Sequence, residues 1–220
     1  MGYRHRQQQR RHGLSLGLLL LLFLFLPLSL GLVACAPAVP RPPAGTFTVA
    51  VEQTGWQKLG SDADPLGSHV AMLAGPVVCS DARGYRLEDL DLELDTGACN
   101  YVSLQQSLPY ALRTGDQLRV VLWHYPLASD PPATGHAALL LLDPQGGATA
   151  EAGVNSAGLS LASSTLLWER TVAIPKMADL YDEVVMLPRD APAGAALVFH
   201  LHNHGVNQWR LQPLLIKPVE

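Results

Sequence analysis

Short segments in which apolar and polar residues alternate dominate the chain from Thr46 onward. Leu90, Leu92 and Leu94, for example, alternate with acidic residues, and a period of two places all three leucines on one face of a β-strand. Clusters of Gly, Pro, Asp and Asn separate these segments and are typical of turns. A series of about eight to ten short strands with turns between them predicts an all-β fold, an antiparallel β-sandwich.

The expected strands cover residues 46–51, 90–95, 101–106, 117–125, 136–142, 166–174, 183–187, 195–204 and 208–216. Two of them, 117–125 and 136–142, are apolar on both faces, which predicts that both lie in the middle of a sheet and not at its edge. Residues 176–184 are expected to hold a turn or two of helix. The Ala- and Gly-rich residues 146–162 are expected to form a long connection.

The first 35 residues differ from the rest in composition. Four arginines and no acid are followed by an apolar run from Leu14 to Leu32, and the run ends in Leu32-Val33-Ala34-Cys35. This order resembles the signal peptide and lipobox of bacterial lipoproteins. The resemblance implies cleavage before Cys35, acylation of its thiol and a lipid anchor in a membrane outside the cytoplasm. The alternative is an uncleaved transmembrane helix, because the run approaches the roughly 20 apolar residues that a bilayer needs.

The lipobox divides the chain into a signal peptide (1–34), a lipidated cysteine with a Pro-rich tether (35–45) and a β-sandwich domain (46–220). In the enterobacterial lipoproteins that this stretch resembles, Asp after the acylated cysteine signals retention in the inner membrane. Ala36 occupies this position, so the resemblance weakly favours the outer membrane. The signal peptide contains four of the 15 basic residues and none of the 19 acids, so the mature net charge is about −8 instead of −4. An acidic domain argues against nucleic acid and against a polybasic membrane patch.

Two cysteines, Cys79 and Cys99, remain once Cys35 is assigned to the lipobox. In an oxidising, extracytoplasmic compartment a disulfide between them is the default expectation. Two separate buried thiols are the alternative.

The stretch from Phe199 to Trp209 is rich in histidine and asparagine. In a strand, His200, His202 and His204 project to one face, opposite Phe199 and Leu201. Same-face neighbours are about 6.6 to 6.8 Å apart, so a metal can bind two adjacent imidazoles and needs a further ligand from another strand. The first candidate for that ligand is His124, with His136 or His69 next. Imidazole ligands indicate Zn or Cu as the metal.

Two other interpretations of the histidines stay open. In the first, they hydrogen-bond across strands and to turns at Asn203 and Asn207, without a metal. In the second, the cluster contacts a ligand directly, with Asn203, Asn207 and Trp209 as binding residues. A flat aromatic platform of the kind that sugars favour is a related possibility; its candidates are Trp56, Trp123, Trp168, Trp209, Tyr101, Tyr110 and Tyr125.

Three short motifs occur in an order that resembles known jelly-roll domains. They are Cys99-Asn100-Tyr101, Thr114-Gly115-Asp116 before an apolar strand, and Trp209-Arg210-Leu211 after an Asn/Gly turn. This order is similar to carbohydrate-binding modules and galactose-binding-like domains. The resemblance implies a jelly-roll sandwich and a noncatalytic binding module, but no calcium site or sugar contact of those families can be matched to positions of this sequence.

Three functions are compatible with these features. The first is a lipid-anchored, noncatalytic module of the cell envelope that binds a glycan, peptide or envelope protein. The second is a histidine-based Zn or Cu protein or enzyme. The third is a structural component of the envelope. A hydrolase receives little support, since the sequence has neither a Gly-X-Ser-X-Gly motif nor a phosphate-binding glycine loop.

Overall fold

The computed structural model describes residues 39–72, 75–142 and 164–220, which belong to a compact unit formed by residues 38–220. The expected signal peptide, Cys35, the first residues of the tether and the connection at 146–162 lie outside the described residues. Within the described ranges, no helix is both long enough and apolar enough to cross a membrane.

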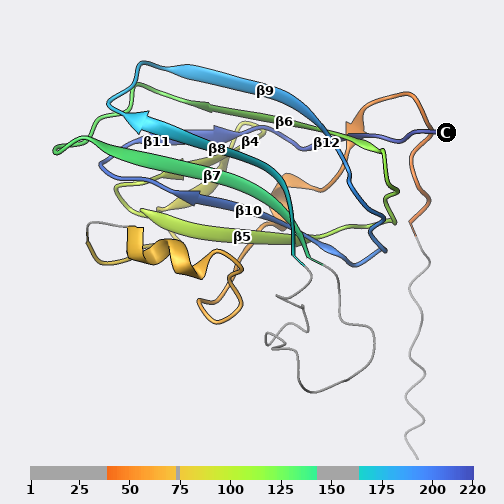
Figure 1. The fold of residues 1–220 in the computed structure, drawn as a ribbon, viewed down its shortest axis with the longest axis horizontal. Coiled ribbons are helices and arrows are strands. Elements are labelled where there is room, and N and C mark those ends of the chain that lie inside the picture. The colour runs from red at the N-terminus through yellow and green to blue at the C-terminus, as the bar shows by residue number, and fades with distance from the viewer. Residues whose placement is uncertain (1–38, 73–74, 143–163) are drawn as a thin grey trace, which may run out of the picture. The chain divides into compact units, whose positions relative to one another are not determined.

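Two antiparallel sheets stacked face to face make up the described part of the chain (Figure 1). The order in sheet A is β1 (Thr48–Val49), β12 (Leu215–Lys217), β6 (Gln117–His124), β11 (Gln208–Leu211), β4 (Asp91–Asp95) and β3 (Tyr85–Glu88). Strands β11 and β12 pair with different parts of one edge of β6, and β9 (Asp179–Met186) pairs with its opposite edge. The order in sheet B is β2 (Gln57–Lys58), β5 (Tyr101–Ser107), β10 (Ala196–His202), β7 (Ala133–Leu142) and β8 (Thr165–Ile174). The predicted all-β antiparallel sandwich is confirmed.

The helical turn expected within residues 176–184 is wrong. These residues belong largely to β9, which pairs along the whole of β6 from Gln117↔Met186 to His124↔Asp179. Half-buried and exposed residues alternate strictly along β9, so one face packs on the core and the other meets solvent. The helical elements among the described residues are two short 3-10 segments, η1 (Gln53–Gly55) and η2 (Gly67–Met72).

Strand β10 is the centre of sheet B and is buried along its full length. Its odd-numbered residues, Leu197, Phe199 and Leu201, point into the main core between the sheets. Its even-numbered residues point to the outer face of sheet B, where Ala196 and Val198 belong to a second apolar cluster. The predicted division of this strand into a core face and a histidine face is therefore confirmed.

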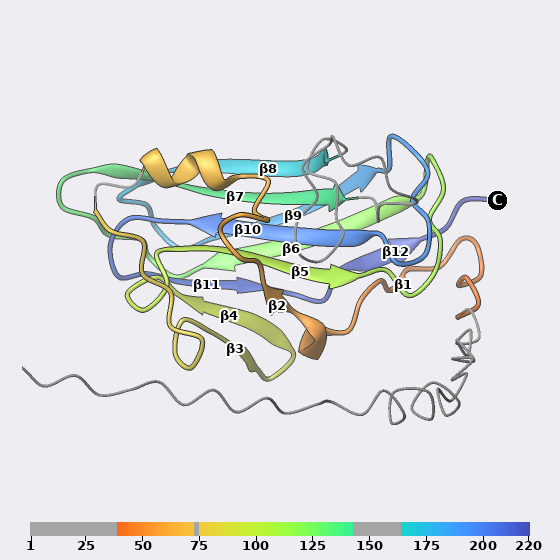
Figure 2. The same ribbon diagram turned by 90° about the horizontal axis from the view of Figure 1, so that it is seen from below.

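A chain segment crosses the outer face of sheet B and covers it. Between β2 and β3 the chain leaves the sandwich, and Leu59 and Ala63 pack against Leu140 of β7 and Val198 of β10. The same segment contains η2, which Figures 1 and 2 show on the outer face of sheet B. We call residues 59–72 and 75–79 the covering segment.

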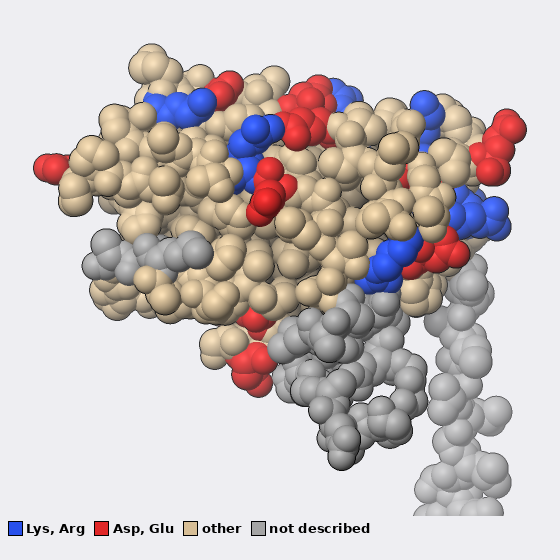
Figure 3. Space-filling model, in the orientation of Figure 1, with Lys and Arg blue, Asp and Glu red and all other residues tan. Residues whose placement is uncertain are grey.

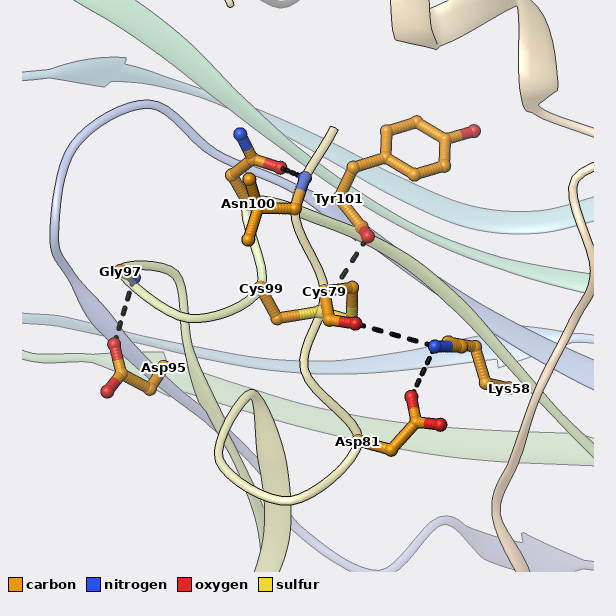
Figure 4. The surroundings of a disulfide bond; sticks show 9 residues. Lys58, Cys79, Asp81, Asp95, Gly97, Cys99, Asn100 and Tyr101 are labelled. Atoms are coloured by element: carbon orange, nitrogen blue, oxygen red, sulfur yellow. Dashed lines mark hydrogen bonds and ion pairs between the residues drawn. A yellow bond between two sulfur atoms is a disulfide. The ribbon is translucent and has the colours of Figure 1, made fainter. Parts of the chain in front are cut away.

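A disulfide attaches the end of the covering segment to the sandwich. Cys79 is bonded to Cys99, two residues before Tyr101 begins β5 (Figure 4). The side chain of Asn100 adds two hydrogen bonds to the segment: it accepts from the Val78 amide at 2.9 Å and donates to the Pro76 carbonyl at 2.9 Å. The predicted pairing of the two cysteines is confirmed.

Part of the expected tether contacts the sandwich. Arg41 forms an ion pair with Asp116, with Nη2 and Oδ1 2.5 Å apart, and the Asp116 side chain is fully buried. Asp116 also accepts hydrogen bonds from the amides of Arg113 at 2.8 Å and Val219 at 3.0 Å. A buried carboxylate needs such partners, so residues from Arg41 onward form part of the folded body.

Basic and acidic side chains are interspersed on the face seen in Figure 3. Ion pairs also link neighbouring strands: Arg119 of β6 makes a two-pronged contact with Asp182 of β9, with distances of 2.7 and 2.6 Å. Arg170 of β8 likewise contacts Glu183 of β9. These contacts pair opposite charges between β6 and β9 and between β8 and β9.

Candidate metal centre

Four histidines meet on the outer face of sheet B, beneath the covering segment. His200 and His202 come from the even-numbered face of β10, and His136 of β7 lies directly opposite His202 in the antiparallel register. His69 of η2 reaches the same point from above the sheet. Two neighbouring strands and one crossing segment therefore bring together residues that are up to 133 positions apart in the sequence.

The four rings are packed closely. The six pairs of ring centroids are separated by 4.9 to 5.7 Å. One ring nitrogen from each histidine lies within 4.8 Å of those of the other three. The nearest approach given by hydrogen-bond geometry is 3.2 Å, between His200 Nε2 and His202 Nδ1. Three of the histidines are buried, and His69 is partly exposed.

Two of the rings have a polar partner on the nitrogen that points away from the cluster. His200 Nδ1 lies 2.8 Å from Ser103 Oγ, and His136 Nε2 lies 3.4 Å from Glu169 Oε2. Among the described residues, the Nδ1 atoms of His136 and His69 are buried without a hydrogen-bond partner. Buried polar atoms are normally paired, so these two unpaired imidazole nitrogens in one cluster call for a ligand.

Burial keeps the central imidazoles neutral. Desolvation, followed by the charges of His202, His136 and His69, lowers the pKa of His200 to about 2. Desolvation, followed by the neighbouring histidines, lowers the pKa of His202 to about 4. The pKa of His69 is also lowered, mainly by desolvation. Neutral imidazole is the form that binds a metal.

The donor set of this cluster selects the class of metal. Zn²⁺ and Cu²⁺ accept imidazole nitrogen readily, whereas Ca²⁺ and Mg²⁺ require oxygen ligands. Tetrahedral zinc at about 2.0 to 2.1 Å from each nitrogen separates the nitrogens by roughly 3.3 Å. The His200–His202 distance of 3.2 Å already matches that value. Two ring nitrogens near the 4.8 Å limit would have to move closer together to bind one zinc ion. His69 is the ligand that can make this movement, because its side chain is on a short 3-10 segment and is not fixed by a sheet.

The structure does not bring His124, the first candidate for the additional ligand, to this cluster. His124 ends β6 in sheet A and points into the core, where its ring lies 4.6 Å from that of Trp209. Its nitrogens contact the Tyr125 carbonyl at 2.7 Å and the Tyr181 hydroxyl at 3.1 Å. Because β6 and β10 belong to different sheets, the main core separates His124 from the outer face of sheet B.

The other predicted site residues also lie outside the cluster. His204 follows the end of β10 in a turn, so the strand geometry that aligns His200 and His202 does not extend to it. The predicted ligand contacts Asn203, Asn207 and Trp209 are buried. Both asparagine side chains donate to the His204 carbonyl at 2.8 Å, and Trp209 Nε1 donates to Asn203 at 3.2 Å. These three residues stabilise the loop and are not accessible to a ligand.

The flat aromatic platform, which the sequence left as one possibility, is not formed. Five of its seven candidates are buried: Trp56, Trp168, Trp209, Tyr101 and Tyr110. The remaining pair, Trp123 and Tyr125, meets edge to face, with ring centroids 5.0 Å apart and planes at 66°. A pair at this angle does not present one continuous flat surface.

Sequence reasoning missed the groups around the histidines. Ser103 shares the outer face of β5 with Tyr101, and strand parity could have suggested that it lies next to a β10 histidine. Glu169 of β8 and Asp64 of the covering segment gave no signal in the sequence, since their positions depend on strand order and on the path of the covering segment.

Comparisons with known proteins give no family for the chain. No family model and no curated protein matches the sequence. Similar solved structures include a mutant of a family 29 carbohydrate-binding module, with 10% identity over 77% of this chain and 89% of that chain and a TM-score of 0.40. A family 29 module complexed with cellulohexaose has 11% identity over 77% of this chain and 89% of that chain, with a TM-score of 0.40. A CBM4 structure has 11% identity over 79% of this chain and 94% of that chain, with a TM-score of 0.40.

We expect the metal-free protein to lose stability as the pH falls below about 6.5, where histidines of the unfolded chain take up protons. In the folded state the pKa values of His200 and His202 are about 2 and about 4. A lowered folded-state pKa gives stability that is present above the unfolded pKa and is lost as the pH falls. Each histidine then contributes a slope of up to about 1.4 kcal/mol per pH unit.

Urea unfolding of the metal-free protein at pH 7 and pH 5 measures this loss. The His200→Asn variant should lose less free energy of unfolding between the two pH values than the unmodified chain, because one of the histidines with a lowered folded-state pKa is gone. An equal decrease in the free energy of unfolding between pH 7 and pH 5 in the two proteins would contradict the expectation. Any destabilisation by the substitution that is the same at both pH values cancels in this comparison.

Proposed function

We propose that this domain binds one divalent transition-metal ion, Zn²⁺ or Cu²⁺, through His69, His136, His200 and His202. The observation that carries the proposal is the convergence of four imidazoles, one nitrogen from each lying within 4.8 Å of the others. Four imidazoles without a metal would leave buried nitrogens unpaired, whereas a bound ion satisfies all four.

The surroundings of the histidines support the same proposal. Metal-binding histidines generally donate their second ring N–H to a carboxylate, carbonyl or hydroxyl, which fixes the ring and its tautomer. Ser103 occupies this position for His200 and Glu169 for His136. Nearby carboxylates also offset the charge of a divalent ion in a site that contributes four neutral ligands.

Four protein ligands fill a tetrahedral coordination sphere. Catalytic zinc sites keep a position open for water or substrate, and structural sites are closed. The arrangement therefore favours metal binding, as a stabilising or carried ion, over metal-dependent hydrolysis.

We expect the chelator-treated protein to bind one equivalent of Zn²⁺ or Cu²⁺ and to gain stability. A ligand at 100 times its dissociation constant stabilises the folded state by about 2.7 kcal/mol. Isothermal titration gives the stoichiometry, and urea unfolding with and without metal gives the gain.

The matched pair for this experiment is His202→Ala and His204→Ala. The first removes a member of the cluster, and the second removes a neighbouring histidine outside it. Metal stabilisation should disappear in the first variant and persist in the second, and Mg²⁺ should stabilise neither. A native protein that gains nothing from Zn²⁺ or Cu²⁺ would refute the proposal.

A second candidate function, glycan binding, is favoured by one feature of the outer face of sheet A. A hollow of about 640 Å³ there is lined by Asp91, Trp123, His124, Tyr125, Ala178, Asp179, Leu180 and Gln212. Arg210 lies over the Trp123 ring at 5.3 Å and is held by Glu93 at 2.7 Å. Aromatic rings bordered by carboxylate, amide and guanidinium groups can contact both the apolar faces and the hydroxyl groups of a sugar.

Tyr125 is 43% exposed and is the accessible ring of this hollow. For a glycan identified on an array, we expect Tyr125→Ala to weaken binding at least tenfold, because truncating a central aromatic commonly costs more than about 1 kcal/mol. Leu166→Ala, at an exposed apolar residue of sheet B, is the matched control. An array without any bound glycan, or equal effects of the two variants, argues against this candidate.

We also propose that the domain lies in the cell envelope and is anchored to a membrane through acylated Cys35. Its support is the order of basic residues, apolar run and Leu32-Val33-Ala34-Cys35 in the sequence. Two or more acyl chains suffice for stable anchoring. Since Arg41 already contacts the body, the chain between Cys35 and Arg41 can span at most about 20 Å, and the domain would stay close to the bilayer.

Intact-mass analysis of membrane-extracted protein tests the anchor. We expect a species that begins at Cys35 and has the added mass of the acyl chains. Cys35→Ser should leave residues 1–34 attached, because the acylated thiol is the feature by which this type of precursor is processed. Native protein that retains residues 1–34 and has no acyl group would contradict the anchor.

A further inference from the structure

Asp64 lies at the point where the covering segment meets the histidine cluster. We infer that Asp64 is a positioning residue for two of the four proposed metal ligands, His200 and His69, although it contacts neither of them by a hydrogen bond. This inference rests on the proposed metal-binding function. The Asp64 carboxylate would orient one ligand in sheet B and one ligand in the covering segment.

The first connection runs through Ser103 to His200. The Ser103 hydroxyl donates to Asp64 Oδ1 at 2.9 Å, and its oxygen lies 2.8 Å from His200 Nδ1. A serine hydroxyl has one hydrogen, and an ionised carboxylate is the stronger acceptor for it. Ser103 must then accept from His200, so the His200 proton is on Nδ1.

This assignment determines which nitrogen of His200 is free. With the proton on Nδ1, the lone pair is on Nε2, which faces His202 Nδ1 at 3.2 Å. Without the carboxylate, Ser103 could donate to His200 Nδ1, and the proton would move to Nε2, inside the cluster. Asp64 therefore holds His200 in the tautomer that a metal requires.

The second connection runs along the covering segment to His69. Asp64 Oδ1 also accepts from the Leu66 amide at 2.9 Å, and the Asp64 carbonyl accepts from the Gly67 amide at 3.1 Å. The Leu66 carbonyl in turn accepts from the His69 amide at 2.8 Å. Asp64 thus forms the turn from which η2 and His69 begin.

Tyr101 ties this turn to sheet B. Its hydroxyl lies 2.7 Å from both Asp64 Oδ2 and the Leu66 carbonyl. Burial, followed by the hydrogen bond to Asp64, raises the pKa of Tyr101, so the phenol keeps its proton and remains a donor. Tyr101 and Ser103 are both buried, and hydrogen bonds to a charged group are strong where water is excluded.

The test uses the full-length chain in detergent, with Asp64→Asn, Ser103→Ala and His69→Ala variants. Asp190→Asn is the matched control, because Asp190 also binds a hydroxyl, that of Thr114 at 2.8 Å, and lies in the connection between β9 and β10, outside the cluster. Zn²⁺ affinity is measured by competition with a chelator, and ¹⁵N-histidine NMR reports the tautomer of His200. Urea unfolding confirms that each variant is folded.

We expect Asp64→Asn to weaken Zn²⁺ binding roughly 10- to 100-fold, the usual effect of removing a group that orients a ligand, and Asp190→Asn to leave it unchanged. The Asn amide oxygen is a weaker acceptor for the Ser103 hydroxyl than the carboxylate, so the fraction of His200 with its proton on Nδ1 should fall in Asp64→Asn. The effect of Asp64→Asn should shrink in the Ser103→Ala and in the His69→Ala background, because each removes one of the two connections. If Asp64→Asn does not fold, the tautomer and affinity of Ser103→Ala test the first connection by themselves.

Unchanged affinity in Asp64→Asn, or a His200 tautomer that is the same with and without Asp64, would overturn the inference. Full additivity of Asp64→Asn with both other variants would also overturn it. An unmodified chain that binds no Zn²⁺ or Cu²⁺ would refute the proposed function instead, and the NMR comparison of the metal-free proteins would still decide whether Asp64 sets the tautomer.

Discussion

The pairing of β10 with β5 on one side and β7 on the other is the interaction on which the rest of the structure depends. It places β10 in the middle of sheet B, with one face against the core and the other beneath the covering segment. Phe199 and Leu201 therefore fix the strand in the core while the adjacent His200 and His202 stand on the opposite face. The rigidity of the core is transmitted directly to the two imidazoles, with no loop between them.

Burying a histidine cluster beneath the covering segment is energetically unfavourable, so the cluster is expected to have a function. Desolvation, with the charges of His202, His136 and His69 as further causes, lowers the pKa of His200 to about 2, and buried nitrogens at His136 and His69 have no partner among the described residues. A purely structural layer at this position could consist of apolar residues. Ala138 and Val198 are such residues, and each lies two positions along its strand from a histidine of the cluster. The polar surroundings, with Ser103 and Glu169 at the outer ring nitrogens, are what a site prepared for a cation requires.

Much of the fold could be predicted from the sequence because strand period and turn residues are local signals. The alternation of Leu92 and Leu94 with acidic residues and the two-sided apolar run of β7 describe the strands correctly. Leu90 is the exception, because it lies in the turn before β4 and is exposed. The presence of two cysteines after the expected signal peptide was sufficient to predict the disulfide. The face of β10 on which His200 and His202 lie also followed from parity alone.

The partners of those histidines could not be predicted in the same way. His124 was preferred to His136 because the sequence does not give the order of strands, and strand order is what sets His136 opposite His202 and His124 in the other sheet. The contribution of His69 depends on the path of a segment with little regular structure. Asp64 belongs to that segment, and its role follows from long-range hydrogen bonds that have no sequence pattern.

The disulfide has a consequence for the order in which this protein matures. Cys79 closes the segment that contains His69 and Asp64 onto the start of β5, where Tyr101 and Ser103 lie. A newly made chain whose thiols are still reduced has only non-covalent bonds to keep that segment in place, while the three sheet histidines are positioned by strand pairing. We expect oxidation to precede the completion of the four-histidine cluster, so a chain retained in a reducing compartment would offer an ion three ligands and release it more readily.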